Sequence, residues 1–253
     1  MRGASNTFQI VKRNVRRNFR TPQLLIFSTI QPVIFLLLFN FVFGGAVSGG
    51  GDESTYINYL LPGILAQTAL FGAIQTGVGL SEDLSKGVID RLRSLPIARY
   101  AVLAGRTLAD AIRNVFVILI MFVVGSMLGF EFDNGWFNFA IGIGLVLLFA
   151  YAFSWISAVI GLLLRDSETV QVAGFIWVFP LVFASSVFVM PETMPEWLQG
   201  FAENQPVTLV VDAMRYLMHG TGDVDAVWHT LLWIAGLLAV FVPLAVWRYR
   251  KVE

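Results

Sequence analysis

Six long apolar segments separated by short polar stretches are the feature that most constrains how this chain can fold. A helix needs about 20 mainly apolar residues to cross the hydrocarbon core of a bilayer. The segments that approach this length are 24–43, 59–80, 114–130, 136–164, 170–189 and 230–247. Only 13% of the residues are charged, against about a quarter in a soluble domain, which leaves too little charge for a polar surface. We therefore predict an all-α polytopic membrane protein, one domain over residues 1–253 with six transmembrane helices.

The basic residues predict how these helices are oriented. If all six segments cross, 16 of the 17 lysines and arginines fall on one side of the membrane, and only Arg215 lies on the other. Cytoplasmic loops of membrane proteins carry the excess of Lys and Arg. The sequence therefore predicts that both termini are cytoplasmic. Adding or removing one span would place a basic loop outside.

A charged stretch at 81–100 separates the second and third predicted spans. Four apolar residues recur in it at helical spacing, namely Leu84, Val88, Leu92 and Leu95. This pattern predicts a short amphipathic helix, and Ser81 followed by Glu82 and Asp83 is typical of a helix N-terminus. Two interpretations remain open. The helix either lies among lipid headgroups with its cations on anionic lipid, or docks on a soluble partner and passes force to both spans.

Polar side chains inside the predicted spans gather on two helical faces. Gln67, Phe71 and Gln75 recur every four residues on the second span. The fifth span repeats the spacing with Gln171, Phe175, Phe179 and Phe183. These faces either line a cavity for an amphipathic substrate or serve ordinary helix packing.

No ionisable residue is predicted near the middle of a span. Asp110 and Arg113, like Arg165 and Asp166, are assigned to cytoplasmic ends of helices. Proton relays and ion sites need ionisable groups at depth. This assignment counts against a proton-coupled antiporter and against a selective ion channel.

The apolar pattern of the external segment 191–228 predicts two short helices, at 196–202 and 207–219. Neither is long enough to cross, so an interfacial or re-entrant hairpin is expected. Arg215 follows Asp212 at a spacing that allows an ion pair on one helix face. The pair either stabilises the hairpin or helps to gate substrate release.

The sequence offers little catalytic or metal chemistry. It contains no Gly-Lys pair and therefore no G-x-x-x-x-G-K-[ST] phosphate loop. If ATP drives this protein, another chain hydrolyses it. Asp225 and His229 are too few ligands for a metal site, and we predict neither a catalytic nor a metal centre.

Three motifs resemble one family of membrane proteins. They are "LPGIL" at 61–65, "DRLRSLPIAR" at 90–99 and "NQPVTLVVDAMRYL" at 204–217. Together they resemble the type-2 ABC permeases, especially the daunorubicin-resistance type of drug-efflux permease. The resemblance extends over essentially the whole chain. It implies that the protein lies in a bacterial plasma membrane.

The resemblance implies a permease that pairs with a second copy and binds separate ATPase subunits, which hold ATP and Mg. It places a coupling helix at 82–95, an interfacial helix at 6–20, and an external re-entrant segment at 191–228. The implied contacts with the ATPase are Glu82, Asp83, Lys86, Asp90, Arg91, Arg93 and Leu95, with Arg165, Asp166 and Glu168 as a second contact. The implied external gate comprises Asn204, Gln205, Pro206, Asp212 and Arg215. Spans two and five would line the substrate pathway.

The sequence thus favours export of an amphipathic drug-like or lipid-like substrate by alternating access, with membrane lipid as a further partner. No cofactor is expected on this chain, and no nucleic acid among its partners. Two alternatives stay open. The first is export of a polysaccharide or lipid-linked precursor, and the second is an ATP-independent secondary transporter or membrane scaffold.

Overall fold

The computed structural model describes residues 10–15, 22–44, 53–88 and 99–251, and the regular structure in these ranges is helical throughout. The elements, in chain order, are α2 (Pro22–Leu38), the π-helical turn η1 (Phe39–Phe43), α4 (Glu53–Ser85), α6 (Arg99–Met127), α7 (Gly135–Leu164), α8 (Ser167–Phe183), the 3-10 helix η2 (Pro191–Thr193), α9 (Glu196–Asn204), α10 (Pro206–His219) and α11 (Asp225–Lys251). The predicted all-α class is confirmed. Of the predicted interfacial helix at 6–20, residues 10–15 are described and helical.

Among the described residues, four helices are long and apolar enough to cross a membrane. They are Tyr56–Ser85, Val102–Met127, Gly135–Leu164 and Asp225–Lys251. The predicted first span corresponds to α2 and η1, which follow each other without a break from Pro22 to Phe43. The predicted fifth span corresponds to α8, which is apolar but has 17 residues. The chain is therefore a multi-pass membrane protein.

Several helices extend beyond the predicted spans, and the difference at α6 is the largest. The third span was predicted to begin at Asn114, but α6 begins at Arg99. The charged residues of the intervening stretch pair with one another and with α4, so the helix continues through them. The second span was predicted to end at Leu80, whereas α4 continues to Ser85.

Two further predictions fail at helix ends. Ser81, Glu82 and Asp83 belong to the last turns of α4 and do not begin a new helix. The fifth span was predicted to reach Val189, but α8 ends at Phe183. After this end the backbone N–H of Ser186 donates to the Thr208 hydroxyl of α10 at 3.1 Å, so the segment turns back toward α10.

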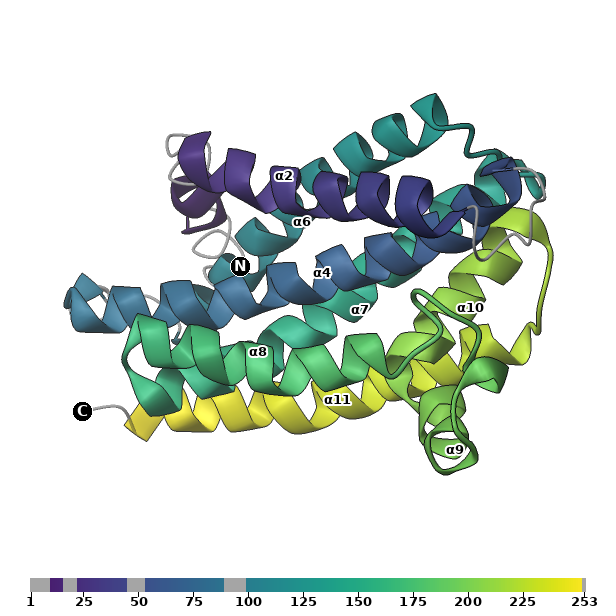
Figure 1. The fold of residues 1–253 in the computed structure, drawn as a ribbon. Helices are drawn as coiled ribbons and strands as arrows, with labels where there is room; N and C mark the ends of the chain where they lie inside the picture. Colours follow the sequence, from purple (N-terminus) through teal and green to yellow (C-terminus); the bar gives the residue numbers. More distant parts are fainter. Residues whose placement is uncertain (1–9, 16–21, 45–52, 89–98, 252–253) are drawn as a thin grey trace.

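Helix α4 lies at the centre of the bundle, in contact with α2, α6, α7, α8 and α10 (Figure 1). Helix α11 packs against α7 and α10 on the outside. The C-terminal ends of α4 and α11 and the turn between α7 and α8 lie at one end of the molecule, and α10 lies at the other (Figure 1). The segments that the charge pattern assigns to one side thus share one end.

Glycines let α4 and α7 approach backbone to backbone. A Cβ added to Gly161 of α7 would collide with the Gly77 carbonyl of α4, and one on Gly77 would collide with the Ser157 carbonyl. In lipid, where helix association relies on close packing, such small residues allow tight contact between helices.

This contact predicts that Gly161→Ala separates α4 from α7. The free energy of unfolding should fall by about 1–3 kcal/mol, as for other overpacked interiors. Gly144→Ala is the matched control, because it lies in the same helix with nothing within 4 Å of the added Cβ. That change should be neutral or stabilise by about 1 kcal/mol or less through helix propensity. Unfolding in one mild detergent measures both, and equal behaviour of the two variants would contradict the packing argument.

Candidate binding pocket

A cavity of about 530 Å³ opens between α2, α4, α6 and α8. One face of α4 supplies Gln67, Phe71 and Gln75, which the sequence had placed on a single stripe. Helix α8 adds Gln171 and Phe175. The structure thus brings five of the seven predicted pathway residues around one space.

The other two predicted pathway residues, Phe179 and Phe183, do not line this cavity. Phe179 packs against Phe71 with ring centroids 5.7 Å apart, and Phe183 stacks on Phe179 at 5.4 Å. Phe71 and Phe175 meet at 5.7 Å. The predicted stripe on α8 is therefore an aromatic ladder of which one end forms a wall of the cavity.

Helix α6 contributes two guanidinium groups to the wall of this cavity. Arg106 and Arg113 both line the cavity and are nearly buried, with 8% and 12% of their side chains exposed. Arg106 Nη1 lies 2.9 Å from Asp83 Oδ2, and its Nε lies 3.3 Å from Asp110 Oδ2. The Thr76 hydroxyl donates to the same Asp110 oxygen at 2.9 Å. These contacts join α4 to α6 through a buried network of charges.

Arg113 lies farther from its carboxylate partner than Arg106 does from either of its own. Its Nη2 donates to the backbone carbonyl of Gly72 at 2.9 Å, and its Nη1 lies 3.6 Å from Asp110 Oδ1. Gly72 and Gly79 make room for the network, since a Cβ at either position would collide with Asn114 or Arg106. A larger residue at either position would displace the side chain of Asn114 or Arg106.

The sequence analysis placed Asp110 and Arg113 at the cytoplasmic end of a span and did not anticipate their burial against α4. Both belong to the long apolar helix Val102–Met127, and Arg113 reaches Gly72, about 20 Å along α4 from Ser85 at 1.5 Å per residue. The spacing of Arg106, Asp110 and Arg113 on one helix face was the signal that could have identified this network.

The end of α4 contributes the mouth of the cavity. Glu82 and Lys86 line it and pair with each other at 3.1 Å, while Asp83 points into the buried network. The other predicted coupling residues, Asp90, Arg91, Arg93 and Leu95, lie outside the described residues. Asp83 is therefore placed for a structural role, and only Glu82 and Lys86 of the described set are exposed at the mouth.

The predicted second cytoplasmic contact is a tight turn between α7 and α8. Arg165 ends α7 with a left-handed backbone, and Asp166 caps α8 by accepting from the Thr169 backbone N–H at 2.7 Å. Hydrogen bonds from the Thr169 hydroxyl and backbone lower the pKa of Asp166. Arg165, Asp166 and Glu168 are all exposed, as a contact surface requires.

At the opposite end, Arg215 holds α10 against α4 and the chain after α8. The predicted pair with Asp212 is confirmed at 2.9 Å. Arg215 Nη2 also donates to the backbone carbonyls of Ser186 at 2.7 Å and Tyr59 at 3.0 Å. The guanidinium lies 3.6 Å from the centre of the Tyr59 ring. One side chain thus joins three segments that are far apart in the sequence.

Gln205 and Pro206 start α10 at this junction. The Gln205 side chain accepts from the Val207 backbone N–H and donates to the carbonyls of Leu181 at 2.7 Å and Ala184 at 3.0 Å, at the end of α8. Asn204 instead bonds within its own helix, to the Gly200 carbonyl. Gln205, Asp212 and Arg215, three of the five predicted gate residues, therefore bind the end of α8, the chain after it or α4, and Pro206 begins α10 beside Gln205.

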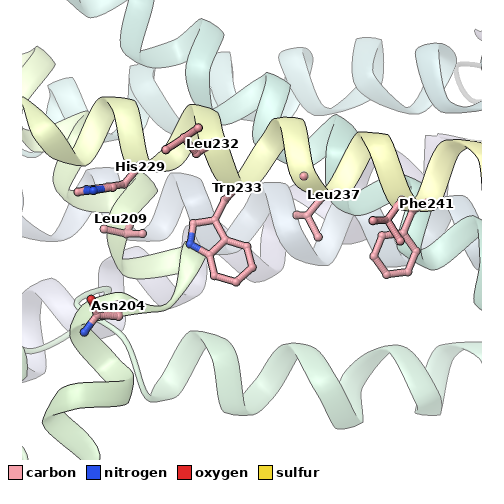
Figure 2. Close-up of a pocket in the computed structure, with 9 residues that line it drawn as sticks. Asn204, Leu209, His229, Leu232, Trp233, Leu237 and Phe241 are labelled. Atoms are coloured by element: carbon pink, nitrogen blue, oxygen red, sulfur yellow. The ribbon is translucent and has the colours of Figure 1, made fainter.

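A second, more open cavity of about 570 Å³ follows the outer face of α11. Figure 2 shows Trp233, Leu237 and Phe241 along α11, with His229, Leu209 and Asn204 at one end. No Asp, Glu, Lys or Arg lines it. It lacks the charged wall of the first cavity, and an apolar groove on a spanning helix suits lipid chains.

A bundle of apolar helices around a cavity with a charged wall defines a polytopic membrane protein with a polar pocket at depth. Comparison with protein families matches residues 5–219 to the family described as ABC-2 type transporter. This chain belongs to that family.

Individual relatives with names of their own extend the comparison. Over 230 residues the chain is 38% identical to the daunorubicin resistance ABC transporter permease protein DrrB1 of Streptomyces coeruleorubidus, covering 91% of this chain and 81% of the relative. It is 30% identical over 229 residues to the probable doxorubicin resistance ABC transporter permease protein DrrC of Mycobacterium tuberculosis H37Rv, with 90% and 82% covered. The putative transport permease ycf38 of Cyanophora paradoxa is 26% identical over 212 residues, with 83% and 73% covered.

The buried network predicts that Arg106→Gln is strongly destabilising. Removing this guanidinium leaves the carboxylates of Asp83 and Asp110 with too little charge compensation, which typically costs about 3–5 kcal/mol. Lys86→Gln is the matched control, because its pair with Glu82 is exposed and such pairs contribute about 0–1 kcal/mol. Detergent unfolding of the two variants measures the difference, and a loss in Arg106→Gln no larger than in Lys86→Gln would refute a structural role for the network.

Proposed function

We propose that this chain is the membrane-spanning permease subunit of an ATP-driven exporter for amphipathic drug-like or lipid-like substrates. The observation that carries the proposal is the cavity between α2, α4, α6 and α8, in a chain that belongs to the ABC-2 type transporter family. Its similarity to daunorubicin and doxorubicin resistance permeases supports export of drug-like molecules. Aromatic walls bind an apolar body, and sparse polar groups orient it.

The transport step is proposed to be alternating access in a pair of permease copies. Closure of the partner ATPases on ATP would move the segment 82–95 and so pull on α4. Because α4 joins α6 through the charged network, both walls of the cavity would move together. At the other end the Arg215 junction would act as the external gate, where release requires α8, α10 and α4 to separate.

ATP and Mg belong, in this proposal, to a separate ATPase chain. Glu82 and Lys86 would contact it beside Asp90, Arg91, Arg93 and Leu95, and the exposed turn with Arg165, Asp166 and Glu168 would give a second contact. A six-span topology with α2 and α8 crossing, and both termini in the cytoplasm of a bacterial cell, follows from the charge distribution. In this arrangement α10 is the re-entrant helix.

Partner dependence tests the proposal. Purification of the tagged chain from its native host in mild detergent should recover an ATPase at about one copy per permease. Arg91→Glu should reduce this recovery at least about tenfold, because a reversed charge converts an attraction into a repulsion. Arg250→Glu, an exposed cation in the last turn of α11, is the matched control and should retain the ATPase.

Recovery of the permease without an ATPase in several detergents would contradict the proposal. It would favour an ATP-independent transporter, for which a buried charge network is also typical. Transport measured without ATP would then decide.

The topology can be tested with single cysteines, because the chain contains none. Asp223→Cys, between α10 and α11, should react with a membrane-impermeant maleimide in intact cells. Lys86→Cys, at the end of α4, should react only in inverted vesicles. Labelling of both positions from the same side would contradict the proposed crossing of α4 and α11.

A further inference from the structure

The charges on the cavity wall are unevenly distributed. Arg106, Arg113, Lys86 and Glu82 line the cavity, whereas the acidic members of the network, Asp83 and Asp110, do not. Glu82 is already paired with Lys86 at the mouth. At depth, therefore, the charged groups that face the cavity are guanidinium groups, and their carboxylates lie behind them.

Arg113 is the less completely neutralised of the two. The Oδ2 atoms of both carboxylates contact Arg106, at 2.9 and 3.3 Å, which leaves Arg113 with one carboxylate oxygen at 3.6 Å. Its closest polar contact, the Gly72 carbonyl, carries no formal charge. A guanidinium has five N–H donors, so it retains donors for a further acceptor. A buried cation is costly unless an anion and hydrogen bonds compensate it.

The surroundings of Arg113 form a site for more than a single ion. Asn114, the next residue, lines the same cavity and offers amide N–H donors. Phe71 and Phe175 stand at the neighbouring wall, with ring centroids 5.7 Å apart, and provide an apolar surface. A ligand that satisfies both parts carries an anionic group at one end and a flat or apolar body at the other.

We propose that the cavity binds an amphipathic anion whose carboxylate or phosphate group is held by Arg113 and Asn114 and whose apolar body packs on Phe71 and Phe175. This rests on the proposed function, since it names the substrate class of the same cavity. Arg113 is then the specificity-determining residue, because a guanidinium binds such groups through paired charge-assisted hydrogen bonds. Molecules with the same body and an uncharged head bind less tightly.

Two probes with one body test the charge preference. Pyrenebutyrate and pyrenebutanol share the aromatic body and differ in the head group. Their dissociation constants are measured on the full chain in phosphatidylcholine nanodiscs, with empty nanodiscs subtracted. The unmodified chain should bind the carboxylate about tenfold more tightly, the value of one charged hydrogen bond. Arg113→Gln should abolish this preference, and Arg250→Gln, an exposed cation of α11, should retain it.

A second variant distinguishes a loss of the charge preference from a loss of the folded structure. Arg113→Gln leaves Asp110 with one cation fewer, so the double variant Arg113→Gln/Asp110→Asn removes one charge of each sign. It should fold, bind pyrenebutanol as the unmodified chain does, and show no preference for the carboxylate. Equal binding of the two probes by the unmodified chain, or a preference that survives in the double variant, overturns the inference.

Phe71→Ala separates this inference from the function on which it rests. Loss of the aromatic wall should weaken both probes several-fold, whatever their charge. If both are weakened but the carboxylate is not preferred, the cavity binds amphipathic molecules and only the anionic class is wrong. If Phe71→Ala changes neither, the cavity is not the binding site, and both the inference and the proposed pathway fail.

Discussion

The buried ion network between α4 and α6 is the interaction on which the arrangement of the cavity depends. In a low-dielectric interior a guanidinium persists only where carboxylates and hydrogen bonds compensate it. Here Asp83 and Thr76 come from one helix, and Arg106, Asp110 and Arg113 come from the other. The network fixes the register of α6 against α4, and this register places two guanidinium groups on the wall of the cavity.

The same central helix connects the two ends of the protein. Helix α4 contributes Glu82 and Lys86 at one end, the cavity stripe in the middle, and the Tyr59 carbonyl that accepts from Arg215 at the other. Gly77 also lets α4 pack directly against the backbone of α7. A displacement at its charged end could therefore reach both the cavity and the Arg215 junction, as the proposed transport step requires.

Much of the cavity stripe and of the Arg215 junction could be predicted from local sequence patterns. The stripe of Gln67, Phe71 and Gln75 follows from the helical period alone, and the structure places these residues around one cavity. The Asp212–Arg215 pair follows from spacing on one helix. The network around Arg113 was not predicted, because a charged residue near the start of an apolar run is normally interpreted as lying outside it. Its partners lie 3 to 41 residues away, and spacing alone did not bring them together.

The sequence by itself determined the all-helical membrane class and predicted that the basic residues gather on one side. Both follow from properties that each segment has independently of the others, namely its apolar length and its charge. Only the tertiary structure decided that α6 begins at Arg99, that Asp83 ends α4 and binds Arg106, and that Arg215 joins three segments. The physical reason is that a buried charge is stable only beside its partner, and these partners come from distant parts of the chain.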